Sequence, residues 1–152
     1  MAASTEPLIG GFYKLEISTN AGVDWDKVAL VTDLSVDESI DEREIVHRDN
    51  CGAKDYIPSY YSGSCSGSAY IKHAATAGSL MTQDLKALFY AKTVFDFKIT
   101  PIDCADPMVG DFEITGSTGF FTSFNSSFPT EEEGTADFSI RFRSAPDYTA
   151  VV

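Results

Sequence analysis

Histidine and cysteine are the side chains of this sequence best suited to catalysis or metal binding, but their spacing matches no such site. His47 and His73 lie on separate segments, and neither has a cysteine or carboxylate at metal-ligand spacing. The cysteines, Cys51, Cys65 and Cys104, form no CxxC pair, and this odd, widely spaced set favours free thiols in a reducing compartment. The sequence therefore predicts no metal site and no cofactor.

Other motifs of catalysis are missing or stand in the wrong context. There is no GxGxxG fingerprint and no phosphate-cradling loop that ends in Gly-Lys-Ser/Thr. Residues 63–67 read Gly-Ser-Cys-Ser-Gly, which resembles the nucleophile-elbow motif in residue types only. That motif needs a strand, a sharp turn and a helix, whereas this segment continues as a strand. We predict that the protein is not an enzyme and has no catalytic residues.

Acidic side chains form the other chemically distinctive segment. Residues 37–44 read DESIDERE, in which Ile40 is the single apolar residue before Ile45. This pattern is typical of a solvated strand edge or corner. Cation binding is the alternative, although the segment lacks the central glycine and the closing spacing of a calcium loop.

Length and composition indicate one globular domain, residues 1–152. The hydrophobic share is 43%, and no apolar run approaches the roughly 20 residues of a membrane-spanning helix. The start, MAASTEPLIGG, lacks the regions of a signal peptide. The formal net charge of −12 argues against nucleic-acid binding by phosphate neutralisation. The acid either keeps the protein soluble or lines a surface that repels an anion.

The elements that would position any site are best seen in a predicted hairpin, residues 119–144. In its second strand, residues 137–143 alternate charged or polar side chains with Phe, Ile and Phe, so one face belongs to a core and the other meets water or a polar surface. In its first strand, strict alternation places Phe120 and Phe124 on one side and Phe121 on the other. A lone hairpin is unstable in water, so the rest of the chain must complete its sheet.

Further segments read as strands and one reads as a helix. The strands are expected at residues 12–18, 27–32, 64–72, 94–100 and 110–115. The helix is expected at residues 80–91, capped by Ser79 or Thr82, with an apolar stripe of Met81, Leu85, Leu88 and Phe89. The small residues of segment 64–72 require a bulky group close by. We predict a mainly β protein, a β-sandwich or partly closed barrel with one flanking α-helix. Its N-terminus (1–10) would be flexible and its C-terminal tail (145–152) without structure.

Residues 45–63 break the strand pattern, and the sequence predicts a long loop there. Such a loop is uncommon in a compact domain. Either it folds back over the core, or it buries its aromatic side chains in a partner. In the second case, the subunit-interface residues would be Ile45, Asp49, Tyr56, Ile57, Pro58, Tyr60 and Tyr61.

The order of these features is similar to that of the major tail protein, or tail tube protein, of long-tailed bacteriophages. The resemblance covers residues 10–144 and rests on order and spacing. Its features are the strand with Leu15 and Ile17, a Trp-led strand from Trp25, the acidic strand 36–46, Asp49-x-x-Gly52, Tyr56-Ile57-Pro58, the Ser/Gly-rich strand 62–69, the single helix and the closing hairpin. Tube proteins of contractile tails and of type VI secretion share the fold of this family.

The resemblance implies a structural virion protein that assembles into stacked hexameric rings, a tail tube through which DNA is ejected without specific binding. It implies partners such as the tape measure and tail terminator proteins, synthesis in the bacterial host cytoplasm, a place in the virion tail and no membrane anchor. The candidates for an acidic lumen wall are Asp37, Glu38, Asp41, Glu42, Asp111, Glu113 and Asp137.

The alternative hypothesis comes from another class of protein. A monomeric β-sandwich binding module would recognise a carbohydrate or protein ligand through Tyr56, Tyr60 and Tyr61. Concentration separates the two hypotheses, because a tube protein forms rings or filaments at high concentration and a binding module stays monomeric.

Overall fold

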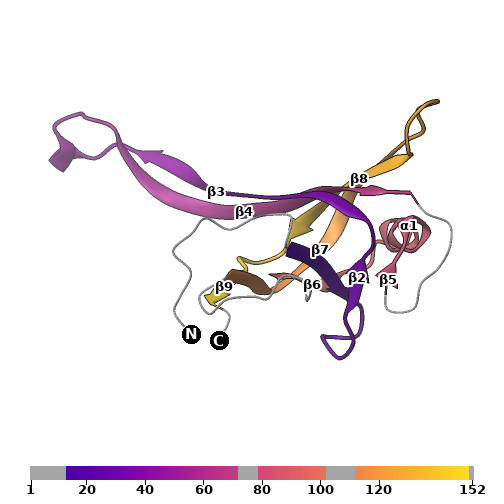
Figure 1. The fold of residues 1–152 in the computed structure, drawn as a ribbon. Helices are drawn as coiled ribbons and strands as arrows, with labels where there is room; N and C mark the ends of the chain where they lie inside the picture. The colour runs from indigo at the N-terminus through magenta and orange to yellow at the C-terminus, as the bar shows by residue number, and fades with distance from the viewer. Residues whose placement is uncertain (1–12, 72–78, 102–111, 151–152) are drawn as a thin grey trace, which may run out of the picture.

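The computed structural model describes residues 13–71, 79–101 and 112–150, and Figure 1 shows its fold. In these ranges the elements are β1 (Tyr13–Ser18), β2 (Asp26–Val28), β3 (Val31–Ile45), a 3-10 turn (Arg48–Asn50), β4 (Asp55–Tyr70), β5 (Ser79–Leu80), α1 (Thr82–Ala91), β6 (Phe95–Pro101), β7 (Phe112–Ser127), β8 (Thr135–Phe142) and β9 (Asp147–Ala150). The predicted mainly β fold with one helix is confirmed. The predicted flexible segment 1–10 lies outside the described residues.

All nine of these strands belong to one sheet, whose order is β3-β4-β8-β7-β6-β1-β2-β5, with β9 added beside β7. The pairs are antiparallel, except that β2 and β5 run parallel. The sheet is not closed into a barrel. It curls over itself, so that β3, β4 and β8 form a layer above β2, β6 and β9 in Figure 1. No helix in the described ranges is long and apolar enough to cross a membrane.

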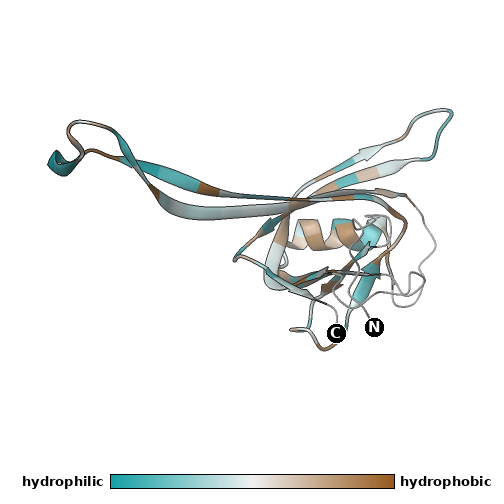
Figure 2. Ribbon diagram, turned by 60° about the vertical axis from the view of Figure 1, so that its left-hand side comes forward, coloured by the Kyte–Doolittle hydropathy of each residue, from teal (hydrophilic) through white to brown (hydrophobic). Residues whose placement is uncertain are grey.

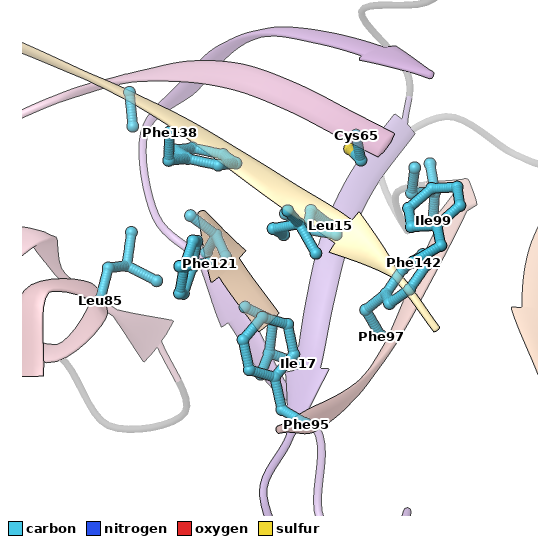
Figure 3. Close-up of a cluster of buried hydrophobic side chains, with 13 residues drawn as sticks. Leu15, Ile17, Cys65, Leu85, Phe95, Phe97, Ile99, Phe121, Phe138 and Phe142 are labelled. Atoms are coloured by element: carbon cyan, nitrogen blue, oxygen red, sulfur yellow. The ribbon is translucent and has the colours of Figure 1, made fainter. Parts of the chain in front are cut away.

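One hydrophobic core lies between the two layers of the curled sheet (Figure 3). Its buried members are Leu15, Ile17, Val28, Cys65, Ala69, Leu85, Phe95, Phe97, Ile99, Phe121, Phe138, Ile140 and Phe142. The alternation predicted in β1, β6 and β8 supplies most of them. Phe97 of the lower layer stacks on Phe142 of the upper layer, with ring centroids 4.7 Å apart. This stacked pair joins the two layers across the core.

The predicted small-residue strand is confirmed as the second half of β4. A Cβ added at Gly67 would lie 2.8 Å from Cζ of Phe138 and 2.7 Å from the carbonyl oxygen of Asp33. Glycine therefore allows the Phe138 ring to pack directly on the backbone of β4.

The predicted hairpin is confirmed as β7 and β8, but the strict alternation in its first strand is wrong. Phe121 pairs with Ile140 and Ser123 with Ser139, so Thr122 forms a bulge. The bulge moves Phe124 to the side of Phe121, and their rings meet edge to face at 6.4 Å. Both aromatic rings therefore serve the core.

Three predicted boundaries are also wrong. Residues 27–32 are not one strand, because a turn at Leu30, with a φ of 57°, separates β2 from β3. Of the strand predicted at residues 110–115, the described part, residues 112–115, is not separate, because β7 continues through a bulge where Gly116 has a φ of 78°. The C-terminal tail is not without structure, since Asp147–Ala150 pairs with the start of β7 as β9.

The long loop predicted at residues 45–63 is the largest error. Residues 55–63 are the first half of β4 and pair with β3 through residue 45. The connection between the two strands is residues 46–54, which include the 3-10 turn. The long irregular loop is therefore a long hairpin with a short tip.

The helix α1 is confirmed, but its start differs from the prediction. The N-cap is Met81 rather than Ser79 or Thr82, and its backbone N–H donates to the Asp84 carboxylate at 3.0 Å. Leu85 is buried against the sheet, while Leu88 and Phe89 are half-buried against the same core. The predicted apolar stripe therefore packs on the sheet.

Replacing Leu85 with Ala is expected to lower the free energy of unfolding by about 2–5 kcal/mol, because it removes a buried side chain and leaves a cavity. Leu85 is 1% exposed. Thermal and urea denaturation measure the loss. The exposed helix residue Gln83, replaced with Ala, is the matched control and should change stability by no more than about 0.5 kcal/mol. Equal stabilities for the two variants would contradict the packing of α1.

Candidate functional site

The most distinctive feature of the molecule is an arm formed by the outer part of the β3-β4 hairpin. β4 pairs with β8 only from Ser64 to Tyr70, so within residues 39–62 the ends of β3 and β4 pair with each other and with no third described strand. We call residues 39–62 the arm. Figures 1 and 2 show that it projects far from the curled body. The register shifts between Ile40 and Glu42, which places a β-bulge near its base.

The arm carries apolar side chains in contact with water. Tyr60 is 78% exposed and Val46 67%, and Ile40, Tyr56 and Ile57 are also exposed. An isolated two-stranded hairpin is only marginally stable, and it cannot bury side chains of its own. Such a cluster of exposed apolar residues on a protruding element indicates an interaction surface.

Ion pairs contribute little to the stability of the arm. Lys54 lies 3.4 Å from Glu44, and His47 lies 3.4 Å from Asp55. All four side chains are exposed, so solvent screens both pairs. The order of the arm therefore comes mainly from the backbone pairing between β3 and β4.

At the base of the arm, Glu38 joins three strands. Its Oε1 accepts a hydrogen bond of 2.6 Å from the Tyr61 hydroxyl of β4. Its Oε2 accepts one of 2.9 Å from the Tyr148 hydroxyl of β9. Burial, followed by the hydrogen bond to Glu38, raises the pKa of both tyrosines above the usual value. Both hydroxyls therefore remain protonated and act as donors.

The upper layer of the sheet turns a polar face of small side chains to the solvent. The members of this polar face are Asp33, Ser35, Asp37 and Ser39 of β3, Ser62, Ser64, Ser66 and Ser68 of β4, Asp137, Ser139 and Arg141 of β8, and Ser123 and Asn125 of β7. Ser35 meets Ser66, and Ser39 meets Ser62, each with 2.8 Å between hydroxyl oxygens. Ser68 donates to the Asp137 carboxylate. Three carboxylates and one guanidinium give this polar face a negative charge.

The strands β3, β4, β8 and β7 leave two edges open. β3 ends the sheet along its whole length. β7 pairs with β9 and β6 only as far as Gly119, so residues 120–127 have no described partner on the side away from β8. Successive antiparallel pairing makes β7 antiparallel to β3. Open edges expose unpaired N–H and C=O groups that can bind another strand.

All seven predicted interface residues lie on the arm. Ile45 ends β3, Asp49 lies in the 3-10 turn at the tip, and Tyr56, Ile57 and Pro58 lie on β4. Tyr60 lies at the bulge and is almost fully exposed. Tyr61 differs from the others, because it is half-buried and its hydroxyl is bound to Glu38.

The predicted acidic residues of a lumen do not gather on one surface. Asp37 and Asp137 lie on the polar face, together with Asp33, which was not predicted. Glu38 pairs with Gly63 on the opposite side of β3. The others are Asp41 and Glu42 on the arm, Glu113 beside Thr149 of β9, and Asp111 outside the described residues. The spacing of four serines at every second residue of β4 was the sequence signal for this face.

Histidine and cysteine are not brought together by the described part of the fold, where no group of three His, Cys, Asp or Glu could hold a metal ion. Burial, with a smaller effect of the Asp37 charge, raises the pKa of the Cys65 thiol to about 12. Cys65 is therefore an unreactive core residue. Cys51 is exposed at the tip of the arm. His73 and Cys104 lie outside the described residues.

Comparison of the sequence with known families and curated proteins gives no match. Comparison of the fold does. The tail of an empty gene transfer agent particle, solved with C6 symmetry, matches with a TM-score of 0.69 over 95% of this chain and 100% of that chain, at 15% identity. The SPP1 tail tube matches with a TM-score of 0.69 over 96% of this chain and 81% of that chain, at 11% identity. This chain has the tail tube fold.

The tail tube fold also occurs in a tube of a different kind. The sheath-tube complex of an extracellular contractile injection system, PVC, matches with a TM-score of 0.66 over 97% of this chain and 94% of that chain, at 16% identity. The resemblance inferred from the order of sequence features is therefore confirmed at the level of the tail tube fold. The same fold is thus found in the SPP1 tail tube and in the tube of a contractile injection system.

Proposed function

We propose that this protein is the building block of a phage tail tube, a structural virion protein that assembles into stacked hexameric rings. The proposal rests on one combination of features. The sheet has two unlike open edges, β3 and residues 120–127 of β7, and an arm projects from the body. The tail tube fold supports the same role. Its location would then be the virion tail.

The two open edges provide a way to close a ring. When β3 of one copy lies beside β7 of the next with the same orientation, the new pair is antiparallel, as are the pairs on either side. Such a contact joins unlike surfaces of identical subunits, and it gives a closed ring when the rotation closes. Six copies agree with the C6 symmetry of the gene transfer agent tail.

The arm provides a way to stack the rings. It continues β3 and β4 along their own direction, whereas the ring contact forms sideways between strand edges. The arm therefore leaves its own ring and reaches the next one. There its apolar side chains, such as Tyr60 and Val46, would be buried.

The polar face would line the lumen, because the other face of the same strands is occupied by the core. Small serine side chains leave the passage open. Asp33, Asp37 and Asp137 repel phosphate groups, so DNA would pass without specific binding. A tape measure protein inside the tube and a terminator at its end are the partners that this role requires.

Electron microscopy of negatively stained protein at increasing concentration tests the proposal. We expect rings and then tubes as concentration rises, and sedimentation should show a growing fraction of large particles. A protein that remains monomeric at all concentrations would favour the alternative, a monomeric binding module. The involvement of Tyr61 with Glu38 already removes one of the three tyrosines on which that alternative depends.

A further inference from the structure

We propose that Glu38 is a positioning residue for the arm and that it couples the direction of the arm to the docking of the C-terminal strand β9. This inference rests on the proposed tube function, in which the arm must point at the next ring. Glu38 stands where the arm leaves the body, since Ser64 is the first β4 residue that pairs with β8. A contact at this point controls the whole projecting hairpin.

The two hydrogen bonds of Glu38 come from different parts of the fold. Tyr61 belongs to the arm itself, whereas Tyr148 belongs to β9, 110 residues away from Glu38 in sequence. β9 is otherwise held by β7, where Tyr148 pairs with Ile114. Each carboxylate oxygen accepts a hydrogen bond from one hydroxyl. If Glu38 moved together with the arm, its hydrogen bond to Tyr148 of β9 would break.

The backbone is built to make this contact possible. Gly63, which pairs with Glu38, is buried and has no side chain. A Cβ at this position would lie 2.7 Å from Cδ2 of Phe142 and closer still to the Tyr61 hydroxyl. The Tyr61 ring therefore folds back over Gly63 to reach Glu38, at the end of the core.

Hydrogen exchange in the unassembled subunit tests this inference. Replacing Tyr148 with Phe removes the hydroxyl on β9 and changes no atom of the arm. We expect amide exchange in residues 55–63 to rise by roughly two- to tenfold, because the lost hydrogen bond to a charged group is exposed and water partly replaces it. Thr149→Val is the matched control. It removes the neighbouring β9 hydrogen bond, from Thr149 to Glu113, and should leave exchange in the arm unchanged.

A second variant, at Glu38 itself, tests whether both hydrogen bonds depend on this one carboxylate. Glu38→Ala removes both acceptor oxygens and should increase exchange in residues 55–63 and in residues 147–150 together, with global unfolding by urea little changed. The inference is overturned if Tyr148→Phe alters exchange only within β9, or if Thr149→Val has the same effect on the arm. Because these measurements use single subunits, they remain distinct from the proposed function, which fails only if the wild-type protein forms no tubes.

Discussion

Replacing residues 41–60 with Asn-Gly is expected to abolish tube formation while the domain still folds. Ile40 and Tyr61 are directly paired, so a two-residue type I′ turn can join them. Tyr61 keeps its bond to Glu38, and every member of the core is retained. Circular dichroism should show a native-like strand signal, and the unfolding free energy should stay close to that of the wild type.

The expected loss of assembly is large because the arm carries much of the apolar surface available for stacking. Burying the remaining exposed surface of an aliphatic side chain such as Val46, which is 67% exposed, is worth roughly 1–2 kcal/mol. Loss of two such side chains raises the concentration needed for assembly by roughly 100-fold. Sedimentation across a concentration series measures this shift.

A conservative variant at the tip is the matched control for removal of the arm. Cys51→Ser changes one exposed tip residue and keeps the strands of the arm, so it should assemble like the wild type. If the protein without residues 41–60 still forms tubes at the normal concentration, the arm does not connect rings. The polar face and the open edges would then have to provide both contacts.

A pair of proline variants on β7 is expected to separate folding from ring closure. Asn125 and Ser126 are exposed neighbours on the strand, paired with Asp137 and Ala136 of β8. The N–H groups of neighbouring strand residues point to opposite sides, so one faces β8 and the other faces the open edge. Proline removes the N–H and favours an extended residue before it, which suits a strand.

The two variants should fail in different ways. The proline that faces β8 leaves a carbonyl without its partner, and should lower the unfolding free energy by about 1–3 kcal/mol. The proline that faces the open edge should keep wild-type stability and yet form no rings in electron micrographs. If both variants close rings normally, the free edge of β7 is not the ring contact.

Regular alternation predicted the strands that have one buried and one exposed face. β6 and β8 were correct in position and in core residues because each has a single clear period. The bulge at Thr122 could not be predicted from the sequence, because it depends on the register in which β7 pairs with β8 and not on the residues of β7 alone. The turn at Leu30 was missed because a leucine at positive φ gives no turn signal in the sequence.

Residues 45–62 of the arm were mistaken for a loop for a physical reason. Its strands are exposed on both faces, so no alternation between buried and exposed positions marks them. Composition still identified its exposed side chains correctly, as with Tyr56 and Tyr60. The Glu38 contact could not be predicted, because Tyr148 meets it only after the whole sheet has curled.

The order of the strands has a consequence for the kinetics of folding. β1 gains its second neighbour, β6, and β4 gains its second neighbour, β8, only after a long stretch of intervening chain has been made. Long-range pairing of this kind carries a large loop-closure entropy and makes folding slow. The β3-β4 hairpin needs only its own short tip to form. During synthesis the hairpin can therefore be complete while its edges are still uncovered, and the nascent subunit is most exposed to mispairing in that interval.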